Sequence, residues 1–406
     1  MTNPSFALDT AIPRHVRIAR RLLFRLLRGI RGSSITVYEG EQAFHFGDSS
    51  APLHADVRIL TPVVYRRLLA GGSIAAAETW MEGQWESHQL TSLLQIVALN
   101  SKIMGRLESG FRLLGRPVER IRHWIRRNHR QQARENIAAH YDLGNAFYAH
   151  FLDEELLYSS ALFSAEEQSL VSAQQAKMAR LCEQLALTSD DHLLEIGTGW
   201  GAMAEYAARH YGCRVTTTTL SREQYNWTTE RIAQAGLQEK VEVLLCDYRD
   251  LTGKYDKLVS IEMIEAVGKR YLPVFFKTCQ ARLRPGGKMV IQAITIQDQR
   301  YRDYGKSVDF IQRYIFPGGF LPSITAMNSL MTQHTDFVVR NLFDMGPDYA
   351  RTLMHWRQRF DHAWPEIEKL GFDERFRRLW LYYFSYCEAG FNARTISVVQ
   401  LTAERV

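Results

Sequence analysis

The stretch HLLEIGTGWGAMAEYAARHYG, residues 192–212, decides the fold class of this chain of 406 residues. Its first five residues are mainly apolar and predict a buried strand, and the alanine-rich segment from residue 202 predicts a helix. Between them lie Gly197, Gly199 and Gly201, which permit a tight turn and a close approach of the backbone to a ligand at the helix N-terminus. The stretch therefore predicts the first strand, turn and helix of a ligand-binding α/β domain.

Strands and helices continue to alternate from residue 190 toward the C-terminus. Further strands are predicted within CRVTTTTLS, VEVLLCDYRD, YDKLVSIEMIEA, KMVIQAITI, DFVVRNLF and TISVVQLTAE. Such alternation predicts a parallel sheet with helices on both faces. We therefore predict a doubly wound, Rossmann-like α/β domain with a mostly parallel seven-stranded sheet over residues 131–406. A helical insertion is expected at about residues 297–390.

The N-terminal part has a different pattern. Residues 33–60 alternate between apolar and polar side chains, which suggests a small antiparallel sheet. Residues 62–106 look helical apart from the GGS at 71–73. We therefore expect a smaller α+β domain over residues 1–130.

Composition places the chain among globular proteins, with 46% hydrophobic and 23% charged residues. Its five cysteines form no C-x-x-C and no metal-type spacing, so we expect a reduced, cytoplasmic protein without a metal site. No run approaches the roughly 20 apolar residues that a membrane-spanning helix needs.

Arginines gather in two stretches and alternate there with apolar residues. Seven lie between Arg14 and Arg31, and eight more between Arg112 and Arg134. Both stretches predict basic amphipathic helices, which suit an anionic lipid surface where each charge adds about 1 kcal/mol. A solvated helix face is the plain alternative. No nucleic-acid-binding motif accompanies these arginines, and we expect no nucleic-acid partner.

Three features favour S-adenosylmethionine over a dinucleotide as the ligand of the glycine turn. Glu195 precedes the first glycine by two residues, and the third strand ends in CDYRD, residues 246–250, with polar groups for an adenine edge. The second strand ends in Thr-Leu-Ser, residues 219–221, without the acid that binds a ribose in NAD proteins. A purely structural glycine turn is the alternative.

The stretch IEMIEAVG, residues 261–268, carries two acids where the fourth strand gives way to a loop. A buried carboxylate is costly unless something pairs with it. Glu265 follows the strand at the edge where such sheets bind ligands, so we expect it to face the ligand. Glu262 is expected within the strand, turned toward the other face, as the structural partner of a basic group.

Several separate blocks together resemble one family, the cyclopropane-fatty-acyl-phospholipid synthases. These enzymes transfer a methylene group from S-adenosylmethionine to a cis double bond of a phospholipid acyl chain, using a class I methyltransferase domain. The matching blocks are GGSIAAAETWMEGQWES at 71–87, HYDLGN at 140–145, LLYSSA at 156–161, EIGTGWG, TLSREQ, DYRD, IEMIEAVG, YIFPGGFLPS at 314–323, GPDYARTLMHW at 346–356 and FNARTISVVQ at 391–400. The first block resembles the lipid-associated N-terminal domain of the bacterial enzymes.

The resemblance implies roles for individual residues. The implied cofactor contacts are Tyr158, Ser159, Glu195, Gly197, Gly199, Gly201, Thr219, Leu220, Gln224, Tyr248 and Arg249. It also implies a pocket for a bicarbonate ion, the presumed base, formed by Glu265, the backbone of Ile294 and Tyr349. The family's cysteine and histidine in that pocket are here Ser160 and Gln292, and the histidine that often follows the acid is Ala266.

These substitutions leave the product open. Methyl transfer to an alkene leaves a carbocation, which the rings of Tyr158 and Tyr349 could stabilise, and ring closure needs a base within reach. Gln292 cannot take up charge as a histidine can. The pocket either still holds bicarbonate and gives a cyclopropane, our first expectation, or gives a methyl-branched or exomethylene chain, the former with a partner reductase. Readings of another class are a small-amine N-methyltransferase and an inactive lipid-binding relative.

The resemblance also suggests partners. We expect unsaturated phospholipid acyl chains at an anionic membrane surface, peripheral association with the cytoplasmic face, and a homodimer.

Overall fold

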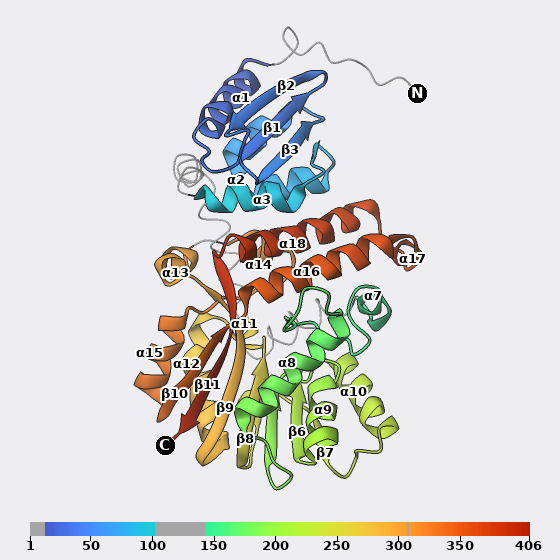
Figure 1. Ribbon diagram of the computed structural model, residues 1–406, viewed down its shortest axis with the longest axis vertical. Helices are drawn as coiled ribbons and strands as arrows, with labels where there is room; N and C mark the ends of the chain where they lie inside the picture. Colours follow the sequence, from blue (N-terminus) through green and yellow to red (C-terminus); the bar gives the residue numbers. More distant parts are fainter. Residues whose placement is uncertain (1–12, 102–142, 307) are drawn as a thin grey trace. The chain divides into compact units, whose positions relative to one another are not determined.

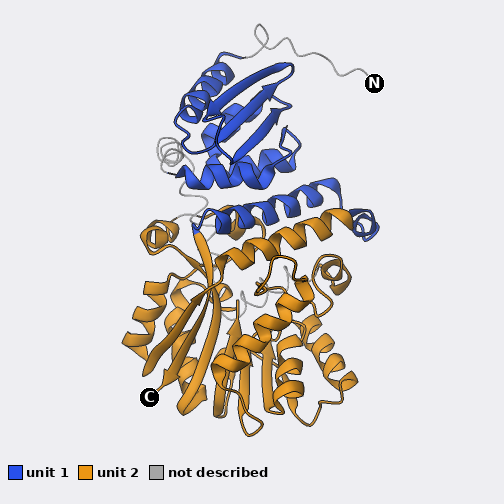
Figure 2. Ribbon diagram, in the orientation of Figure 1, with its two compact units in different colours: residues 1–122, 364–395 blue, residues 123–363, 396–406 orange. Residues whose placement is uncertain are grey.

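The computed structural model describes residues 13–101, 143–306 and 308–406 (Figure 1). The chain forms two compact units: residues 1–122 with 364–395, and residues 123–363 with 396–406 (Figure 2). The sequence-based boundaries kept residues 364–395 with the larger domain, whereas the structure groups them with the smaller unit. The second basic stretch, residues 112–134, and the start of the HYDLGN block lie outside the described residues.

The larger unit is built on a seven-stranded sheet with the strand order β10-β11-β9-β8-β5-β6-β7. Strands β5 to β9 run parallel, and β11 is antiparallel to both of its neighbours. The prediction of a doubly wound α/β fold with a mostly parallel seven-stranded sheet is confirmed. The strands are β5 His192–Ile196, β6 Arg214–Thr219, β7 Val241–Leu245, β8 Tyr255–Ile261, β9 Leu283–Ile296, β10 Phe337–Asp344 and β11 Ile396–Arg405.

Helices and short 3₁₀ turns connect these strands. They are α7 Asn145–Ala149, α8 Leu170–Leu185, α9 Ala202–Tyr211, α10 Arg222–Gln234, η1 Tyr248–Asp250, α11 Ile264–Val267, η2 Lys269–Tyr271, α12 Leu272–Arg282, α13 Asp298–Tyr304, α14 Phe310–Tyr314, α15 Ile324–His334 and α16 Gly346–His362. Several begin at side-chain caps: the hydroxyl of Ser169 accepts from the third residue of α8, and Ser221 does the same for α10.

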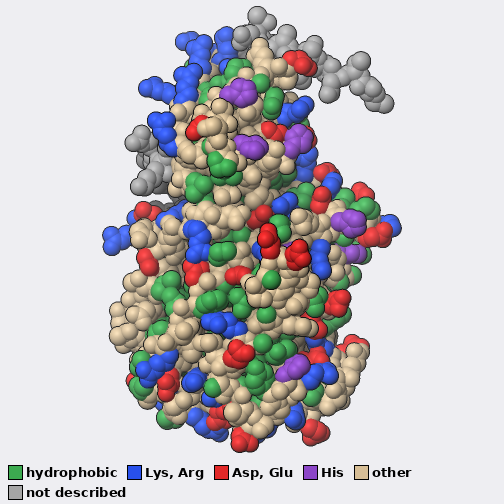
Figure 3. Space-filling model, viewed as in Figure 1, with side chains coloured by type: hydrophobic (Ala, Val, Ile, Leu, Met, Phe, Trp, Pro, Cys, Tyr) green, Lys and Arg blue, Asp and Glu red, His purple; other side chains and the backbone are tan. Residues whose placement is uncertain are grey.

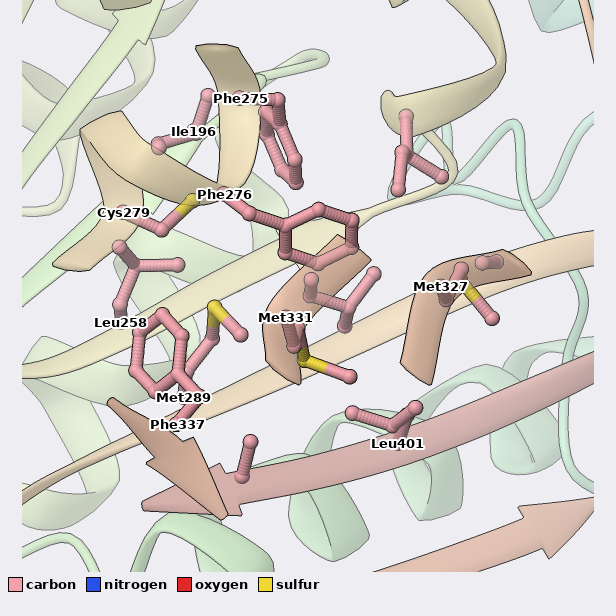
Figure 4. Close-up of a cluster of buried hydrophobic side chains, with 14 of the residues drawn as sticks. Ile196, Leu258, Phe275, Phe276, Cys279, Met289, Met327, Met331, Phe337 and Leu401 are labelled. Atoms are coloured by element: carbon pink, nitrogen blue, oxygen red, sulfur yellow. The ribbon is translucent and has the colours of Figure 1, made fainter. Parts of the chain in front are cut away.

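Two apolar layers cover the two faces of this sheet. On one face α12 and α15 pack Phe275, Phe276 and Met331 against Leu258 and Leu401 (Figure 4). The other layer joins side chains of α8, α9 and α10 to the strands, with Leu181, Ala207 and Ile232 among them. Because both faces are covered, the central strand β5 is almost wholly buried.

The order of the strands creates a switch point between β5 and β8. From β5 the chain builds β6 and β7 on one side, and then returns to build β8 and β9 on the other. Connections therefore leave β5 and β8 in opposite directions. Open sheets bind ligands in the crevice at the carboxyl ends of strands at such a point. The glycine turn follows β5 there, and the two acids follow β8.

The smaller unit contains a four-stranded sheet with the order β2-β1-β3-β4. Its elements are α1 Arg14–Leu27, β1 Ser34–Glu39, β2 Gln42–Gly47, β3 His54–Ile59, α2 Val63–Met81, β4 Trp85–Glu86, α3 Leu90–Leu99, α17 Trp364–Glu368 and α18 Glu374–Asn392. The expected antiparallel sheet is wrong in one pair, because β1 and β3 run parallel. The prediction that the GGS interrupts the helix is confirmed at Gly72, whose φ of +55° and ψ of −135° are not helical, so α2 consists of two helical segments that meet at a kink there.

Helix α18 packs against α2 and α3 within the smaller unit. The indole of Trp80 donates to the backbone oxygen of Arg378 at 3.0 Å, and the Arg378 guanidinium returns a bond to the backbone oxygen of Trp80 at 3.1 Å. Arg378 also pairs with Glu86 at 3.0 Å. These reciprocal bonds attach a segment near the C-terminus to the N-terminal sheet and helices.

Candidate active site

The glycine turn after β5 is shaped for close approach. Gly197 has φ of +102° and Gly201 has φ of +87°, values that side-chain-bearing residues rarely adopt. A Cβ on Gly201 would lie 2.7 Å from Cγ2 of Thr228, and one on Gly197 would lie 3.2 Å from Cβ of Met263. The backbone N–H groups of Gly197 and Thr198 both donate to the oxygen of Thr218, at 3.1 and 3.0 Å. The turn is therefore fixed against the neighbouring strand β6.

The ends of β5 and β6 carry the next predicted cofactor residues. Glu195 is buried and accepts a bond from the Thr217 hydroxyl at 2.6 Å, and burial raises its pKa to about 8. The Thr219 hydroxyl donates to Oε1 of Gln224, in the first turn of α10, at 2.8 Å. Leu220, which follows Thr219, is half-buried. These side chains line the carboxyl edge beside the glycine turn.

The third strand contributes Tyr248 and Arg249 through the short turn η1. Arg249 makes a bidentate pair with the buried Asp247, with Nε at 2.8 Å and Nη2 at 2.5 Å from the carboxylate oxygens. Its guanidinium carbon lies 5.6 Å from the ring centroids of both Tyr248 and Tyr271. The sequence analysis placed Asp247 among the polar groups of CDYRD without a separate role, and in the structure it orients Arg249, a predicted contact residue. The glycine turn, which packs too closely on Thr228 to admit a Cβ at Gly201, and these polar side chains fit S-adenosylmethionine.

A buried lysine, also missed from the sequence, connects the two halves of the site. The ammonium of Lys177 on α8 donates to the Ser159 hydroxyl at 2.8 Å, and the charges of Glu262, Asp153 and Glu195 act on it. Burial lowers its pKa to about 8 despite these carboxylates. The signal was present: Lys177 falls on the apolar face of its helix, four residues from Leu181, where a lysine needs buried anionic partners.

Glu262 is the acid on which the predicted pocket converges. Its Oε1 accepts from the backbone N–H of Ser160 and from Nε2 of Gln292, both at 2.8 Å. Its Oε2 accepts from the hydroxyl of Tyr349 at 2.7 Å. The expectation that Glu262 lies in the strand and turns to the other face is wrong, because β8 ends at Ile261 and Glu262 has φ of +49°.

Ser160 and Gln292 hold Glu262 in specific ways. The Ser160 hydroxyl donates to the backbone oxygen of Ala161 at 3.0 Å, so Ser160 reaches the acid through its backbone. Gln292 accepts a bond on Oε1 from Nε2 of Gln400 at 3.0 Å, which directs its amide nitrogen toward the acid. The glutamine that stands at the family's histidine position is thus a fixed donor.

Glu265 lies on the short helix α11 in different surroundings. Its Oε1 accepts from the backbone N–H of Ile294, and its buried Oε2 has no hydrogen-bond partner among the described residues. Burial, and then the neighbouring charge of Glu262, raise the pKa of Glu265 to about 8. Of the predicted pocket residues, the structure therefore brings Ile294 to Glu265 and the other three to Glu262.

This arrangement does not fit a separate bicarbonate ion among those residues. The N–H of Ser160, the amide of Gln292 and the hydroxyl of Tyr349 already donate to a carboxylate that belongs to the chain. An added anion would have to displace Glu262 or share its donors beside a like charge, which is unfavourable in a buried site.

Aromatic rings surround the same region. Tyr158 lies 5.2 Å from Trp356 between ring centroids, and Tyr349 meets Trp356 edge-on at 6.0 Å. Tyr148 lies 5.5 Å from Tyr158 and 5.1 Å from Trp200. Trp356 therefore packs against both Tyr158 and Tyr349, the two tyrosines predicted to face a developing cation. Aromatic faces attract cations, more strongly when water is excluded.

Two kinds of feature are absent from the described residues. They contain no cluster of three or more histidine, cysteine, aspartate or glutamate side chains that could hold a metal ion. No helix among them is long and apolar enough to cross a membrane.

Comparison with known proteins agrees with the geometry. Residues 128–401 match the family model described as mycolic acid cyclopropane synthetase. The chain is 38% identical to the tuberculostearic acid methyltransferase UfaA1 of Mycobacterium tuberculosis, covering 89% of this chain and 87% of that protein. It is 35% identical to the cyclopropane-fatty-acyl-phospholipid synthase of Escherichia coli, covering 88% and 89%. The crystal structure of mycolic acid cyclopropane synthase CmaA1 complexed with SAH and CTAB superposes with a TM-score of 0.63 at 29% identity, covering 67% of this chain and 98% of that one.

Proposed function

The chain belongs to the mycolic acid cyclopropane synthetase family and is an S-adenosylmethionine-dependent methyltransferase; from this premise we propose that it adds a one-carbon unit to the cis double bond of an unsaturated phospholipid acyl chain. The proposed product is a cyclopropane. One observation carries this proposal: a half-buried, hydrogen-bonded carboxylate, Glu262, lies next to an aromatic cluster at the cofactor edge of the sheet.

Each part of this arrangement has a task in the reaction. S-adenosylmethionine supplies an electrophilic methyl group when it is bound. The rings of Tyr158, Tyr349 and Trp356 stabilise the positive charge that the acyl chain acquires. The side chains that hold the acid, Ser160, Gln292 and Tyr349, are buried and limit the access of water, which would otherwise capture that cation. A carboxylate in the pocket then accepts the proton whose loss closes the ring.

Product analysis with labelled cofactor tests the proposal. The protein is incubated with vesicles of a cis-monounsaturated phospholipid and S-adenosylmethionine with a trideuterated methyl group, and the acyl esters are analysed by mass spectrometry before and after ozone. A product that keeps two deuterium atoms and resists ozone is a cyclopropane. Absence of label in the acyl esters would contradict the proposed function.

A methyl-branched product is the second candidate, and the similarity to a tuberculostearic acid methyltransferase favours it. Its precursor would still contain a double bond, and a partner reductase would saturate it. The same experiment separates the cases, because an ozone-cleavable product with three deuterium atoms means that the proton left the acyl chain. An ozone-cleavable product with two means an exomethylene group.

The alternatives of another class make different predictions. A small-amine N-methyltransferase would label soluble amines and leave the acyl esters unlabelled. An inactive lipid-binding relative would not consume S-adenosylmethionine at all. The intact glycine turn and the arrangement of Glu262 and Glu265 support an active enzyme.

We further propose that helix α1 contacts an anionic lipid surface. Arg14, Arg17, Arg21, Arg25 and Arg28 are exposed, and Lys and Arg side chains gather over this helix in Figure 3. Ile18 and Leu22 lie among these arginines, and their exposed fractions are 48% and 38%. Val16, Ala19 and Phe24 are buried, so the exposed basic and apolar side chains are available to lipid.

Vesicle sedimentation tests this contact. Because each arginine adds about 1 kcal/mol at an anionic surface, Arg17→Glu/Arg21→Glu/Arg25→Glu should weaken binding to phosphatidylglycerol vesicles at least about 100-fold. The exposed residues Arg214, Lys277 and Arg302 provide a control with the same change of charge, all three replaced by glutamate. If both triple variants bind the vesicles equally weakly, the loss comes from net charge alone and α1 is not the contact surface.

A further inference from the structure

The carboxylate of Glu262 is held in its ionised form by neutral donors. Two N–H groups and one hydroxyl donate to its oxygens, from Ser160, Gln292 and Tyr349. Hydrogen bonds of this kind stabilise the charged form of a carboxylate, and the nearby charge of Lys177 acts in the same direction. Burial opposes both and raises the pKa of Glu262.

Glu265 has fewer donors and is the neutral member of the pair. It receives one backbone hydrogen bond, from Ile294, and its other oxygen has no partner among the described residues. Two adjacent buried carboxylates do not both ionise readily, so the better-solvated one carries the charge. The hydrogen bonds therefore favour the charge on Glu262 and the proton on Glu265.

The backbone at Glu262 supports a functional reason for its side chain. Its φ of +49° lies in the left-handed region, which costs a residue with a side chain roughly 1–2 kcal/mol. A glycine would avoid that cost. Strained residues of this kind persist where the surrounding structure holds them, and they cluster at functional sites.

Glu262 also lies beside the predicted cofactor site. Its neighbour Met263 lies close to the glycine turn, where its Cβ would be 3.2 Å from a Cβ added to Gly197. Ser160, which donates to it, directly follows Ser159, and Lys177 bonds to that serine while its charge acts on both Glu262 and Glu195. The carboxylate is therefore within the site and not in a separate core.

We propose that Glu262 is the proton acceptor of the reaction, a carboxylate built into the chain in place of a bound bicarbonate ion. The chemistry of this inference rests on the proposed function. The position of Glu262 in the site rests on its hydrogen bonds to Ser160, Gln292 and Tyr349.

The chemical step balances without another reactant. As the methyl group bonds to one alkene carbon, its bond to sulfur breaks and the other alkene carbon becomes cationic. The Glu262 carboxylate then takes one proton from the transferred methyl group. The electron pair of that C–H bond forms the second carbon–carbon bond of the ring. The carboxylic acid afterwards releases its proton to solvent, and Glu262 returns to its ionised form.

Two variants of Glu262 test this role. Glu262→Gly removes the carboxylate, relieves the positive φ and leaves the three donors facing a space that fits a small anion. Glu262→Gln removes the base but fills the same space. Both are assayed in carbonate-free buffer, with and without formate or bicarbonate. Binding of ¹³C-labelled bicarbonate is followed separately by NMR, which does not depend on turnover.

The expected results follow from the loss of a general base. Wild-type turnover should change less than about twofold on addition of bicarbonate, and both variants should lose about 100-fold or more. Formate or bicarbonate should restore Glu262→Gly at least about tenfold and should not restore Glu262→Gln. Bicarbonate should bind Glu262→Gly and not the wild type.

Other results overturn the inference. Bicarbonate-dependent wild-type turnover would show that an external ion is the base, and wild-type turnover by Glu262→Gln would show that this carboxylate is not. If Glu262→Gly does not fold, the bicarbonate dependence of the wild type and the turnover of Glu262→Gln still decide whether Glu262 is the base. If the wild type labels no lipid while Glu262→Gly gains bicarbonate binding, the anion position of Glu262 stands and the proposed function falls.

Discussion

Each unit of the molecule contains a glutamate that accepts a bond from a tyrosine hydroxyl, and the two sites differ in what else surrounds the acid. In the smaller unit Glu39 accepts from Tyr65 and pairs with Arg20 at 2.7 Å. In the larger unit Glu262 accepts from Tyr349 and has no cation within ion-pair distance among the described residues. Direct pairing with a cation neutralises a carboxylate, whereas neutral donors hold it without consuming its charge. The comparison separates an acid that stabilises a fold from one that remains available to a proton.

The largest expected difference comes from removing each charge in turn. Glu262→Gln should lower kcat by about 10²–10⁴ and change the free energy of unfolding little. Glu39→Gln should lower the free energy of unfolding by about 1–3 kcal/mol, because Arg20 loses its charged partner, and leave kcat of the folded enzyme unchanged. Turnover assays and urea denaturation of both variants measure this. A comparable loss of kcat in the two would erase the distinction.

Removing the tyrosine hydroxyl that donates to each glutamate should again lower kcat in the larger unit and stability in the smaller one, by smaller amounts. Tyr349→Phe withdraws one donor from Glu262, which makes its carboxylate easier to protonate and should lower kcat about tenfold. Tyr65→Phe withdraws a donor from Glu39 and should cost about 1–2 kcal/mol of stability without that loss of rate. The pH–rate profile of Tyr349→Phe should also shift its acidic limb upward. An unshifted limb would argue that the hydroxyl acts elsewhere.

The neutral state of Glu265 should be visible in stability. Its pKa is raised to about 8 from an ordinary value of 4.5, so the folded protein keeps a proton that the unfolded chain releases. This contribution is fully present below pH 4.5 and is lost as pH rises toward 8. Glu262 is the group whose charge acts on Glu265, and Lys177 acts on Glu262 in turn. Glu195, whose pKa is also raised to about 8, titrates in the same interval but is common to the wild type and a Glu265 variant.

Thermal unfolding of the unliganded protein between pH 5 and 8 measures this slope. Glu265→Gln, which stays neutral at every pH, should lose less stability than the wild type over that interval. Parallel curves for the two proteins would mean that Glu265 is already ionised at pH 5.

The smallest expected effect concerns Gln400, which positions the Gln292 amide. Gln400→Met should free that amide to rotate and lower kcat about three- to tenfold with KM unchanged, because one hydrogen bond of about 1 kcal/mol is lost. Gln400→Asn should lose less. A change confined to KM would assign Gln400 to substrate binding instead.

Local patterns in the sequence predicted much of the larger unit. The glycine turn, the strand–helix alternation and the edge that carries both acids all follow from short-range rules, and the structure has them. The orientation of Glu262 could not be read in this way. Side chains alternate with a period of two only while the strand lasts, and β8 ends one residue before Glu262. Glu262 therefore has a positive φ, and its side chain points into the pocket and not toward the far face of the sheet.

Other features depended on contacts distant in sequence. Lys177 was readable in principle from its helix face, but its partners Ser159, Glu195 and Glu262 come from three other segments. Helix α18 looks like part of the helical insertion, and its packing on α2 and α3 and its bonds to Trp80 and Glu86 assign it to the smaller unit. Such assignments are set by which surfaces meet, which amphipathic periodicity does not specify.

The attachment of α18 to the smaller unit has a consequence for synthesis on the ribosome. The sheet and helices made from residues 13–101 lack one of their packing helices until residues 374–392 have been translated. At 5–20 residues per second this interval is roughly 15–60 s. Throughout it the apolar faces of α2 and α3 are unfinished, so the first part of the chain to emerge is among the last to complete its fold. A gene truncated before codon 374 should therefore yield an N-terminal fragment that chaperones retain.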